Sequence, residues 1–221
     1  MIPILFQDQH LVVCLKPPGL LSQDGPGDTL PETLRGQLRC GIFPVHRLDR
    51  EAGGVMVYAK TKAAAGKLSR TVAQGEMIKT YLCVVRGCPQ ETEGVYRDLL
   101  LHDKSRNKSF VVQRMRGGVK DAKLAFRVLA ARGGTALVRV RLFTGRTHQI
   151  RVQFASRKTP LLGDRKYGGG EGNLALWSME LAFPHPISGE FLHFFAPPDG
   201  GLWEDFRDAL DDLQMTDSTS G

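Results

Sequence analysis

A short charged segment that runs directly into an apolar stretch constrains this chain most. The segment Pro44–Lys60 reads PVHRLDREAGGVMVYAK, and its second half, Val55–Ala59, has the β-branched content of a buried strand. Four ionisable side chains stand within five residues ahead of that strand: His46, Arg47, Asp49 and Arg50. Ions resist leaving water, so a carboxylate among cations at the rim of a core is either paired or used. The segment alone leaves an ion-paired loop and a catalytic site equally open.

The net charge of +7 hides an asymmetry along the chain. Residues 1–170 hold 29 Lys and Arg against 13 Asp and Glu, a balance of +16, whereas residues 171–221 hold only Arg207 against ten acids, a balance of −9. A basic body suits a polyanion, because cations that neutralise phosphates release counterions. Many solvated proteins are basic, so charge alone does not decide the ligand.

Length and composition exclude several classes of protein. The 221 residues can bury a sizeable core, and no apolar run approaches the roughly 20 residues that span a bilayer. The N-terminus lacks the pattern of a signal peptide. The four cysteines form no CxxC pair, and Cys14 and Cys83 lie in expected strands, which favours buried free thiols in a reducing cytoplasm. The six histidines are scattered, so we expect no metal site.

Periodicity and turn residues predict alternating strands and helices in one domain, residues 1–214, followed by a disordered tail, residues 215–221. Expected strands cover Ile4–Leu15 (a pair broken at residues 7–9), Val55–Ala59, Met77–Arg86, Lys123–Ala131, Thr135–Phe143, Leu174–Leu181 and Phe191–Phe195. Expected helices cover Thr29–Leu38, Thr61–Gln74, a segment capped by Thr147 and reaching about Ser156, and a C-terminal segment containing Leu202–Leu213. The strand at Thr135–Phe143 should have one buried and one wet face, with Arg139 and Arg141 on the wet face.

Residues 104–120 contain six cations and no acid, with Phe110-Val111-Val112 in the middle. This pattern predicts an exposed hairpin or arm with basic flanks. A solvated loop remains the alternative. Further on, the expected strand ending at Phe143 meets a glycine turn and a helix start in Thr144–Arg151, an arrangement that favours anions.

Three separated motifs carry a resemblance to a known family. HRLD with Asp49, K-x-Y-L with Tyr81 and TGRTHQIR ending at Arg151 occur in this order, and together they resemble the RluA-type family of RNA pseudouridine synthases. The resemblance extends to KPPG at residues 16–19, to GDxxYG at 163–168 and to FxHPxxG at 183–189, and so covers roughly Ile4–Pro198.

The resemblance implies an α+β fold, with a mixed, mostly antiparallel central sheet, flanking helices and a catalytic cleft across the sheet. It implies an isomerase that converts uridine in RNA, either tRNA or rRNA, into pseudouridine without metal or organic cofactor. Many relatives carry an RNA-binding domain ahead of the catalytic one, which we expect to be missing here. We expect a monomer.

By the same resemblance, the catalytic residues are Asp49, Arg151 and Tyr81. Asp49 would be the nucleophile, and Arg151 would favour its charged form. Tyr81 would stack on the target uracil and assist proton transfer. Attack at the sugar and attack at the base both remain open.

The resemblance also implies residues that bind the substrate. Arg47 would fill the space left by the flipped base, and Ile150 would give an apolar wall against the ring. Lys79 would contact a phosphate or support the site. The expected substrate-binding set is Arg47, His46, Ile150, Lys79 and Arg146.

One position departs from the family pattern. After HRLD the family often reads two residues and then Thr-Ser-Gly, whereas this chain has Ala52-Gly53-Gly54. The loss of two hydroxyls near Asp49 leaves a catalytically inactive RNA-binding or folding factor as the alternative function. An unrelated hydrolase with an aspartate nucleophile would need a second acid or base, for which Glu51 is the nearby candidate.

Overall fold

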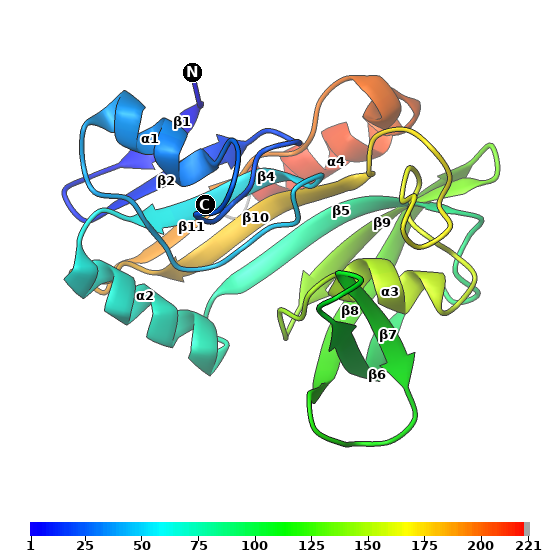
Figure 1. Ribbon diagram of the computed structural model, residues 1–221. Coiled ribbons are helices and arrows are strands. Elements are labelled where there is room, and N and C mark those ends of the chain that lie inside the picture. Colours follow the sequence, from blue (N-terminus) through cyan, green and yellow to red (C-terminus); the bar gives the residue numbers. More distant parts are fainter. Residues whose placement is uncertain (219–221) are drawn as a thin grey trace. The chain divides into compact units, whose positions relative to one another are not determined.

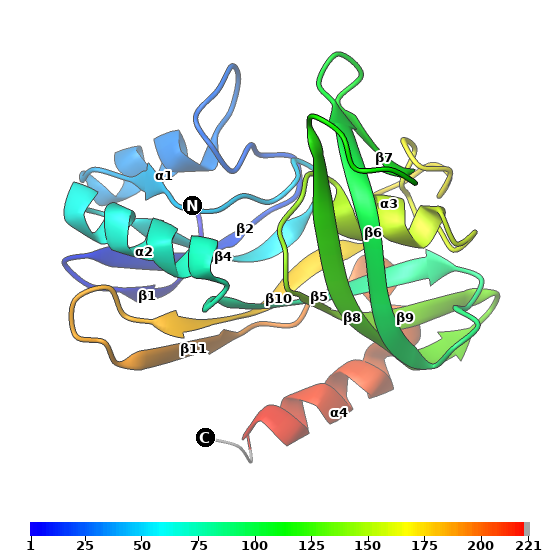
Figure 2. The ribbon, with the colours of Figure 1, turned by 90° about the horizontal axis from the view of Figure 1, so that it is seen from below.

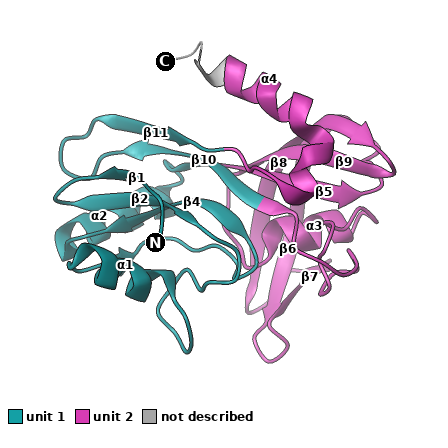
Figure 3. Ribbon diagram, turned by 90° about the horizontal axis from the view of Figure 1, so that it is seen from above, with its two compact units in different colours: residues 1–79, 177–196 teal, residues 80–176, 197–221 magenta. Residues whose placement is uncertain are grey.

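Two units make up the chain in the computed structural model, which describes residues 1–218 and their side chains up to residue 215. The first unit contains Met1–Lys79 and Trp177–Ala196, and the second contains Thr80–Leu176 and the chain from Pro197 onward (Figure 3). The expectation of one catalytic domain over residues 1–214 stays a prediction.

The first unit is built on a sheet with helices α1 (Leu30–Leu38) and α2 (Lys62–Gln74) (Figure 1). Its strands are β1 (Ile4–Gln7), β2 (Leu11–Lys16), β3 (Phe43–Pro44), β4 (Gly53–Ala59), β10 (Leu176–Pro184) and β11 (Phe191–Phe195). They lie in the order β1-β2-β4-β10-β11, with β3 beside β4. The β4–β10 pairing is parallel, and the other pairings in this unit are antiparallel.

Local sequence explains both helices. Thr29 caps α1 by accepting a hydrogen bond from the Glu32 amide at 3.2 Å, and a proline occupies the first turn. Thr61 caps α2 in the same way, and α2 ends at Gly75. Strand β4 is buried along its whole length, and α2 packs Leu68 against the same core.

The second unit is built on a second run of strands. They are β5 (Ile78–Arg86), β6 (Glu93–Asp103), β7 (Lys108–Val112), β8 (Val119–Arg132) and β9 (Thr135–Leu142), in the order β5-β9-β8-β6-β7. All four pairings are antiparallel (Figure 2). The helices are α3 (Gln149–Ala155), the 3-10 helix η1 (Gly201–Phe206) and α4 (Arg207–Ser218).

The two faces of this second sheet differ as expected. Val138 and Val140 of β9 are buried, whereas Arg139 and Arg141 are exposed. Tyr81 is directly paired with Val140, so it lies on the buried face. Helix α3 covers that face, because its Phe154 ring packs against rings of β6 and β8 at centroid distances of 5.3 and 5.8 Å.

The expected fold class is confirmed, since the strands are mixed and mostly antiparallel with helices beside them. Strand β6 was not predicted. Thr147 as the cap of α3 is wrong: His148 takes that position in a left-handed conformation, with φ of 53° and no side-chain cap. Helix α4 continues to Ser218 where we expected disorder, and residues 219–221 lie outside the described part. The cleft across the sheet stays a prediction.

Candidate active site

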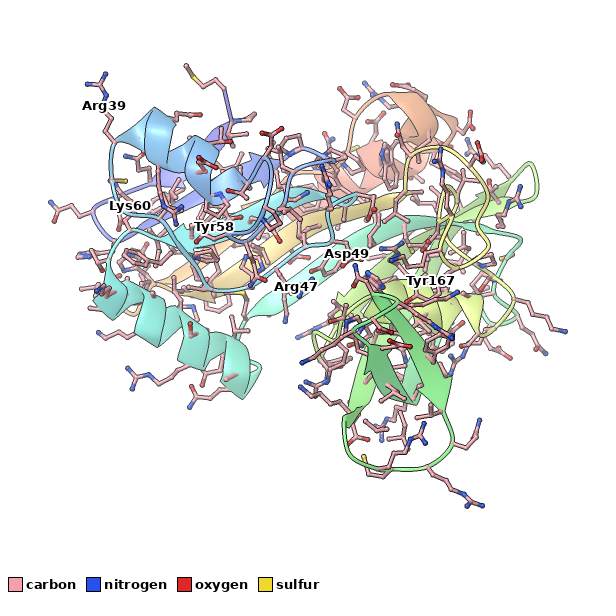
Figure 4. The ribbon with its side chains drawn as sticks, viewed as in Figure 1. Arg39, Arg47, Asp49, Tyr58, Lys60 and Tyr167 are labelled. Carbon is pink, nitrogen blue, oxygen red and sulfur yellow. The ribbon has the colours of Figure 1, made fainter. Side chains whose placement is uncertain are left out.

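Asp49 lies on the loop between β3 and β4 (Figure 4), and Ser22 holds this loop. The Ser22 hydroxyl donates to the Leu48 carbonyl at 2.7 Å and accepts from the Leu48 amide at 3.0 Å. Tyr58 in turn donates its hydroxyl to the Ser22 carbonyl at 2.9 Å. A further turn closes between the Ala52 amide and the Asp49 carbonyl at 3.1 Å. The residue preceding the carboxylate therefore has a fixed backbone.

Lys16 is fully buried and joins the front of the chain to the same loop. Its ammonium donates to three backbone carbonyls, those of Pro17 at 3.0 Å, Arg50 at 3.0 Å and Ala52 at 2.7 Å. Burial lowers the pKa of Lys16 to about 8, although the negative charges of Asp49 and Glu51 act in the opposite direction. A buried cation thus holds the loop through its backbone and lies within electrostatic reach of the candidate nucleophile.

Gly53, which stands where the family often has serine, and Gly54, which matches the family glycine, both lie against β10. Gly54 has φ of 116°, and a Cβ there would lie 2.2 Å from the Ser178 carbonyl oxygen. A Cβ on Gly53 would lie 2.4 Å from the ring of Trp177, which is fixed by a 2.8 Å hydrogen bond from its Nε1 to the Ala196 carbonyl. Residue 54 must therefore be glycine, and the indole of Trp177 takes the space of a side chain at residue 53.

His46 is buried and neutral. The Val57 amide donates to its Nε2 at 3.1 Å, which leaves the ring proton on Nδ1. Burial, aided by the charge of Lys79, lowers the pKa of His46 to about 3. Nδ1 has no hydrogen-bond partner within the part of the chain that the structure describes. His46 is thus a neutral imidazole with an unused donor, three residues from Asp49.

Side-chain exposure alternates along this loop. His46 and Leu48 are buried, whereas Arg47 is exposed and Asp49 is partly exposed. The buried residues anchor the loop, and the two charged residues between and after them keep access to solvent. This alternation leaves Arg47 exposed and Asp49 partly exposed to solvent.

Arg151 belongs to the second unit, where a buried ion pair with Asp164 fixes it. Its Nε donates to Asp164 Oδ2 at 2.7 Å and its Nη2 to Oδ1 at 2.9 Å, with only 5% and 0% of the two side chains exposed. Asp164 Oδ1 also accepts the backbone amides of Lys166 at 3.1 Å and Tyr167 at 3.3 Å. A bidentate pair of this kind fixes the plane of the guanidinium.

Tyr167 (labelled in Figure 4) ties three segments of the second unit together. Its hydroxyl accepts the Ser109 amide of β7 at 2.7 Å and lies 3.0 Å from His148 Nδ1. Its ring centroid lies 5.4 Å from Arg151 Cζ and 5.1 Å from Lys108 Nζ. The Tyr167 side chain therefore contacts both strand β7, which lies in the basic segment 104–120, and the start of α3.

The remaining expected site residues are placed as follows. Tyr81 and Ile150 are buried, with 5% and 4% of their surfaces exposed. Arg146 is partly buried and donates its Nε to the Asp121 carbonyl at 2.8 Å. The expected site set divides between the units: His46, Arg47, Asp49 and Lys79 in the first, and Tyr81, Arg146, Ile150 and Arg151 in the second. The pairing of Asp49 with Arg151 stays a prediction.

Four supporting residues escaped the sequence analysis: Lys16, Ser22, Asp164 and Tyr167. Three of them stand in the motifs that carry the family resemblance, which was the available signal, but no role followed from it. Ser22 lies in a stretch that reads only as a loop, and nothing in the sequence singled it out.

Other chemical features are few. Among residues 1–218, no group of three or more His, Cys, Asp or Glu side chains could hold a metal ion. No helix in that part of the chain is long and apolar enough to cross a membrane. All four cysteines are free, and Cys14 and Cys83 are buried as expected. Burial raises the pKa of the Cys14 thiol to about 12, so this thiol is inert.

Comparison with known sequences agrees with the motifs. The family described as RNA pseudouridylate synthase matches residues 10–156. The dual-specificity RNA pseudouridine synthase RluA of Escherichia coli is 35% identical over 206 residues, which cover 89% of this chain and 93% of RluA. The RNA pseudouridine synthases YhcT of Bacillus subtilis and slr1629 of Synechocystis are 33% and 35% identical, and this chain spans 68% and 64% of their lengths.

Comparison with solved structures gives the same result. Human RNA pseudouridylate synthase domain containing 4 matches with a TM-score of 0.75 at 26% identity, over 96% of this chain and 93% of that one. With the sequence matches and the ordered motifs around Asp49, Tyr81 and Arg151, this likeness shows that the chain belongs to the RluA-type family of RNA pseudouridine synthases, which are isomerases.

Proposed function

We propose that this enzyme converts specific uridines of structured tRNA or rRNA into pseudouridine, with Asp49 as the nucleophile and the target nucleotide flipped out of its stack. The carrying observation is the loop between β3 and β4, where a partly exposed Asp49 carboxylate stands on a backbone fixed by Lys16 and Ser22. A nucleophile that must meet one carbon atom gains from such a backbone, because misplacement of about 1 Å is costly.

The reaction exchanges one bond to the sugar for another. The bond from N1 of uracil to C1′ of ribose breaks, the base turns, and C5 bonds to C1′. The proton on C5 leaves, N1 gains a proton, and Asp49 is released unchanged. The carboxylate attacks either C1′ or the uracil ring, and both routes require it to be ionised. Arg151 would favour that ionised form, and its pairing with Asp164 keeps the guanidinium in one orientation.

The remaining expected residues would hold the flipped nucleotide. Tyr81 offers its ring to the uracil and Ile150 gives the apolar wall. Arg47 is exposed and suits the space that the base leaves. His46 contributes through Nδ1, the donor that no described protein group uses. Lys79 and Arg146 would contact phosphates.

The RNA class follows from the relatives only as a proposal. RluA is named a dual-specificity synthase, and another relative, 34% identical and from Nitrosomonas europaea, is named ribosomal large subunit pseudouridine synthase D. Both tRNA and rRNA are therefore candidate substrates. A cytoplasmic, monomeric enzyme that needs no metal or organic cofactor completes the proposal.

The test is release of tritium from RNA labelled at C5 of uridine, with purified tRNA and rRNA assayed separately. Asp49→Ala should abolish release from the pool that wild type modifies, while RNA binding stays within a few fold. Asp164→Glu, which keeps the charge, should retain part of the release. Equal release by wild type and Asp49→Ala would overturn the assigned nucleophile, and no release by wild type from either pool would favour an RNA-binding factor instead.

A further inference from the structure

A second surface of the second unit has the composition of an RNA contact. It is the exposed face of β6, β8 and β9, which lie next to one another (Figure 2). Directly paired residues of neighbouring strands lie on the same face of a sheet. Arg97 pairs with Lys123, and the Phe143 amide, just past β9, bonds to the Lys123 carbonyl at 3.1 Å. Arg141 pairs with Ala125 in the next row.

Positive charge dominates this face. It carries five cations, Arg97, Lys123, Arg127, Arg139 and Arg141, and two acids, Glu93 and Asp121. Glu93 lies 3.5 Å from Arg127. Within residues 1–218, neither Arg97, Lys123 nor Arg141 forms an ion pair with an acid. Arg97 faces Lys123 across strands, and Arg127 faces Arg139. Like charges directly opposite each other destabilise a sheet, so an anion bound beside Arg97 and Lys123 would reduce the repulsion between these two cations.

An aromatic ring stands among these cations. Phe143 keeps 42% of its surface exposed, with Lys123 Nζ 4.4 Å and Arg141 Cζ 5.6 Å from its ring centroid. A cationic groove or face with an exposed aromatic side chain is how proteins hold single-stranded RNA, because cations contact phosphates while bases stack on the ring.

This face is distinct from the candidate catalytic residues of the second unit. Tyr81 pairs with Val140, whose neighbours in sequence, Arg139 and Arg141, point the other way. Helix α3, which carries Arg151, packs on the Tyr81 side through Phe154. RNA on the exposed face of β6, β8 and β9 would therefore lie on the side of the sheet opposite to Tyr81.

We propose that Arg97, Lys123, Arg141 and Phe143, here called the cationic sheet face, bind unpaired nucleotides of the substrate RNA away from the target uridine. The three cations contact phosphates, and one base stacks on Phe143. The inference rests on the proposed function for the identity of the RNA, and it adds a binding surface that the catalytic motifs do not include.

The test compares RNA affinity across salt concentrations for two matched triple variants. Arg97→Gln, Lys123→Gln and Arg141→Gln remove three unpaired cations of the sheet face. The control removes three exposed cations that already have acidic partners: Arg132→Gln, Arg165→Gln and Arg207→Gln. Each single-strand phosphate contact contributes about 0.7 to the slope of log affinity against log salt, so the sheet-face variant should lose about 2. Its affinity should fall tenfold or more, while the control stays within about twofold.

Phe143→Leu tests the stacking step without changing charge. We expect an affinity loss of about tenfold for RNA with an unpaired loop and no change in salt slope, because one base–aromatic stack is worth about 1 to 3 kcal/mol. Turnover at saturating RNA should stay near wild type in all variants. If both triple variants bind alike, or if Phe143→Leu binds as wild type, the cationic sheet face is not an RNA surface of this kind. Binding is measured without turnover, so a wild type that releases no tritium overturns the proposed function and leaves this result readable.

Discussion

The loop that carries Asp49 and the first turn of α3, which carries Arg151, hold their charged residues in position in different ways. In the first unit, Lys16 and Ser22 hold backbone carbonyls, and the Asp49 side chain stays partly exposed. In the second unit, Asp164 holds the Arg151 side chain itself, and both groups are buried. A carboxylate that must attack a substrate needs its oxygens accessible, so its support comes through the backbone. The Arg151 guanidinium only has to orient and stabilise a negative charge, so its side chain can be fixed directly by an ion pair.

The largest effect on stability should follow from removing the ion pair between Asp164 and Arg151. Asp164→Asn leaves a buried guanidinium beside a neutral amide, which should lower the free energy of unfolding by about 3 to 5 kcal/mol in urea titrations. Asp98→Asn is the matched control, since Asp98 pairs with Arg157 at 2.9 Å but with 32% of the arginine side chain exposed. The control should lose about 1 kcal/mol. If Asp164→Asn and Asp98→Asn lose the same free energy of unfolding, burial does not make the Arg151–Asp164 pair more important for stability than the exposed pair.

The corresponding change in the first unit is Lys16→Met. It keeps the bulk but removes the donor from three carbonyls, and should cost about 2 to 3 kcal/mol at pH 7, less than Asp164→Asn because a buried charge is removed as well. Hydrogen exchange should locate the loss in residues 16–22 and 46–52. The control, Lys60→Met, removes one hydrogen bond to the Asp8 carbonyl and should cost about 1 kcal/mol.

Lys16 also gives a pH dependence of known sign. Its folded pKa is about 8 against 10.5 when unfolded, so between these values the unfolded chain binds more protons. Protonation of Lys16 therefore lowers the free energy of unfolding most below pH 8, and this penalty falls as the pH rises from 8 to 10.5. Between pH 8 and 10.5, the free energy of unfolding of wild type should rise relative to that of Lys16→Met, as measured by urea titrations of both proteins at each pH. A constant difference between the two proteins would show that the buried amine keeps an ordinary pKa.

Removing one hydroxyl from each region should give smaller and similar effects. Ser22→Ala takes away the donor and acceptor of Leu48, and Tyr167→Phe takes away the partner of the Ser109 amide and of His148. Each should cost about 1 to 2 kcal/mol. Exchange of the Ser109 amide should accelerate in Tyr167→Phe and stay unchanged in Ser22→Ala. The reverse pattern would contradict the assignment of these contacts to separate units.

The smallest effect on stability should come from neutralising cations of the basic segment, residues 104–120. Residues 104–107 at its tip are exposed, and Arg106 pairs with Asp103 at 3.7 Å. Lys104→Gln, Arg106→Gln and Lys108→Gln together should change the free energy of unfolding by under about 1 kcal/mol yet weaken RNA binding and reduce its salt slope. If affinity and slope do not move, the segment is the solvated loop that the sequence left open.

Strong local signals made parts of the fold predictable. Strand β4 is a continuous apolar run, the β8–β9 hairpin has Gly133-Gly134 at its turn, and α1 and α2 begin at threonine caps. Residues 93–98 of strand β6 alternate between exposed and half-buried positions. The exposed positions include the apolar Val95 and the half-buried ones the acidic Asp98, so the sequence has no period-two pattern of apolar residues and the strand was missed. The cap of α3 failed because His148 takes a conformation that local propensity disfavours.

Site residues that stand in contiguous motifs could be predicted from the sequence. Partners that only folding brings together could not. HRLD marks Asp49 directly. The partner of Arg151 lies 13 residues further on and is chosen by tertiary structure. Lys16 could not be foreseen as buried, since lysine is almost never fully buried unless its ammonium is satisfied, and its acceptors at residues 50 and 52 are distant in sequence.

The contact between Gly53 and Trp177 has a consequence for how this chain can evolve. A serine at residue 53 would place Cβ 2.4 Å from the indole, so that change alone is blocked. Loss of the indole alone leaves a void beside a glycine and frees the Ala196 carbonyl. Each single step is harmful, whereas the two together are compatible, which is the condition for strong non-additivity. Descendants of this sequence should therefore keep or exchange residues 53 and 177 as a pair.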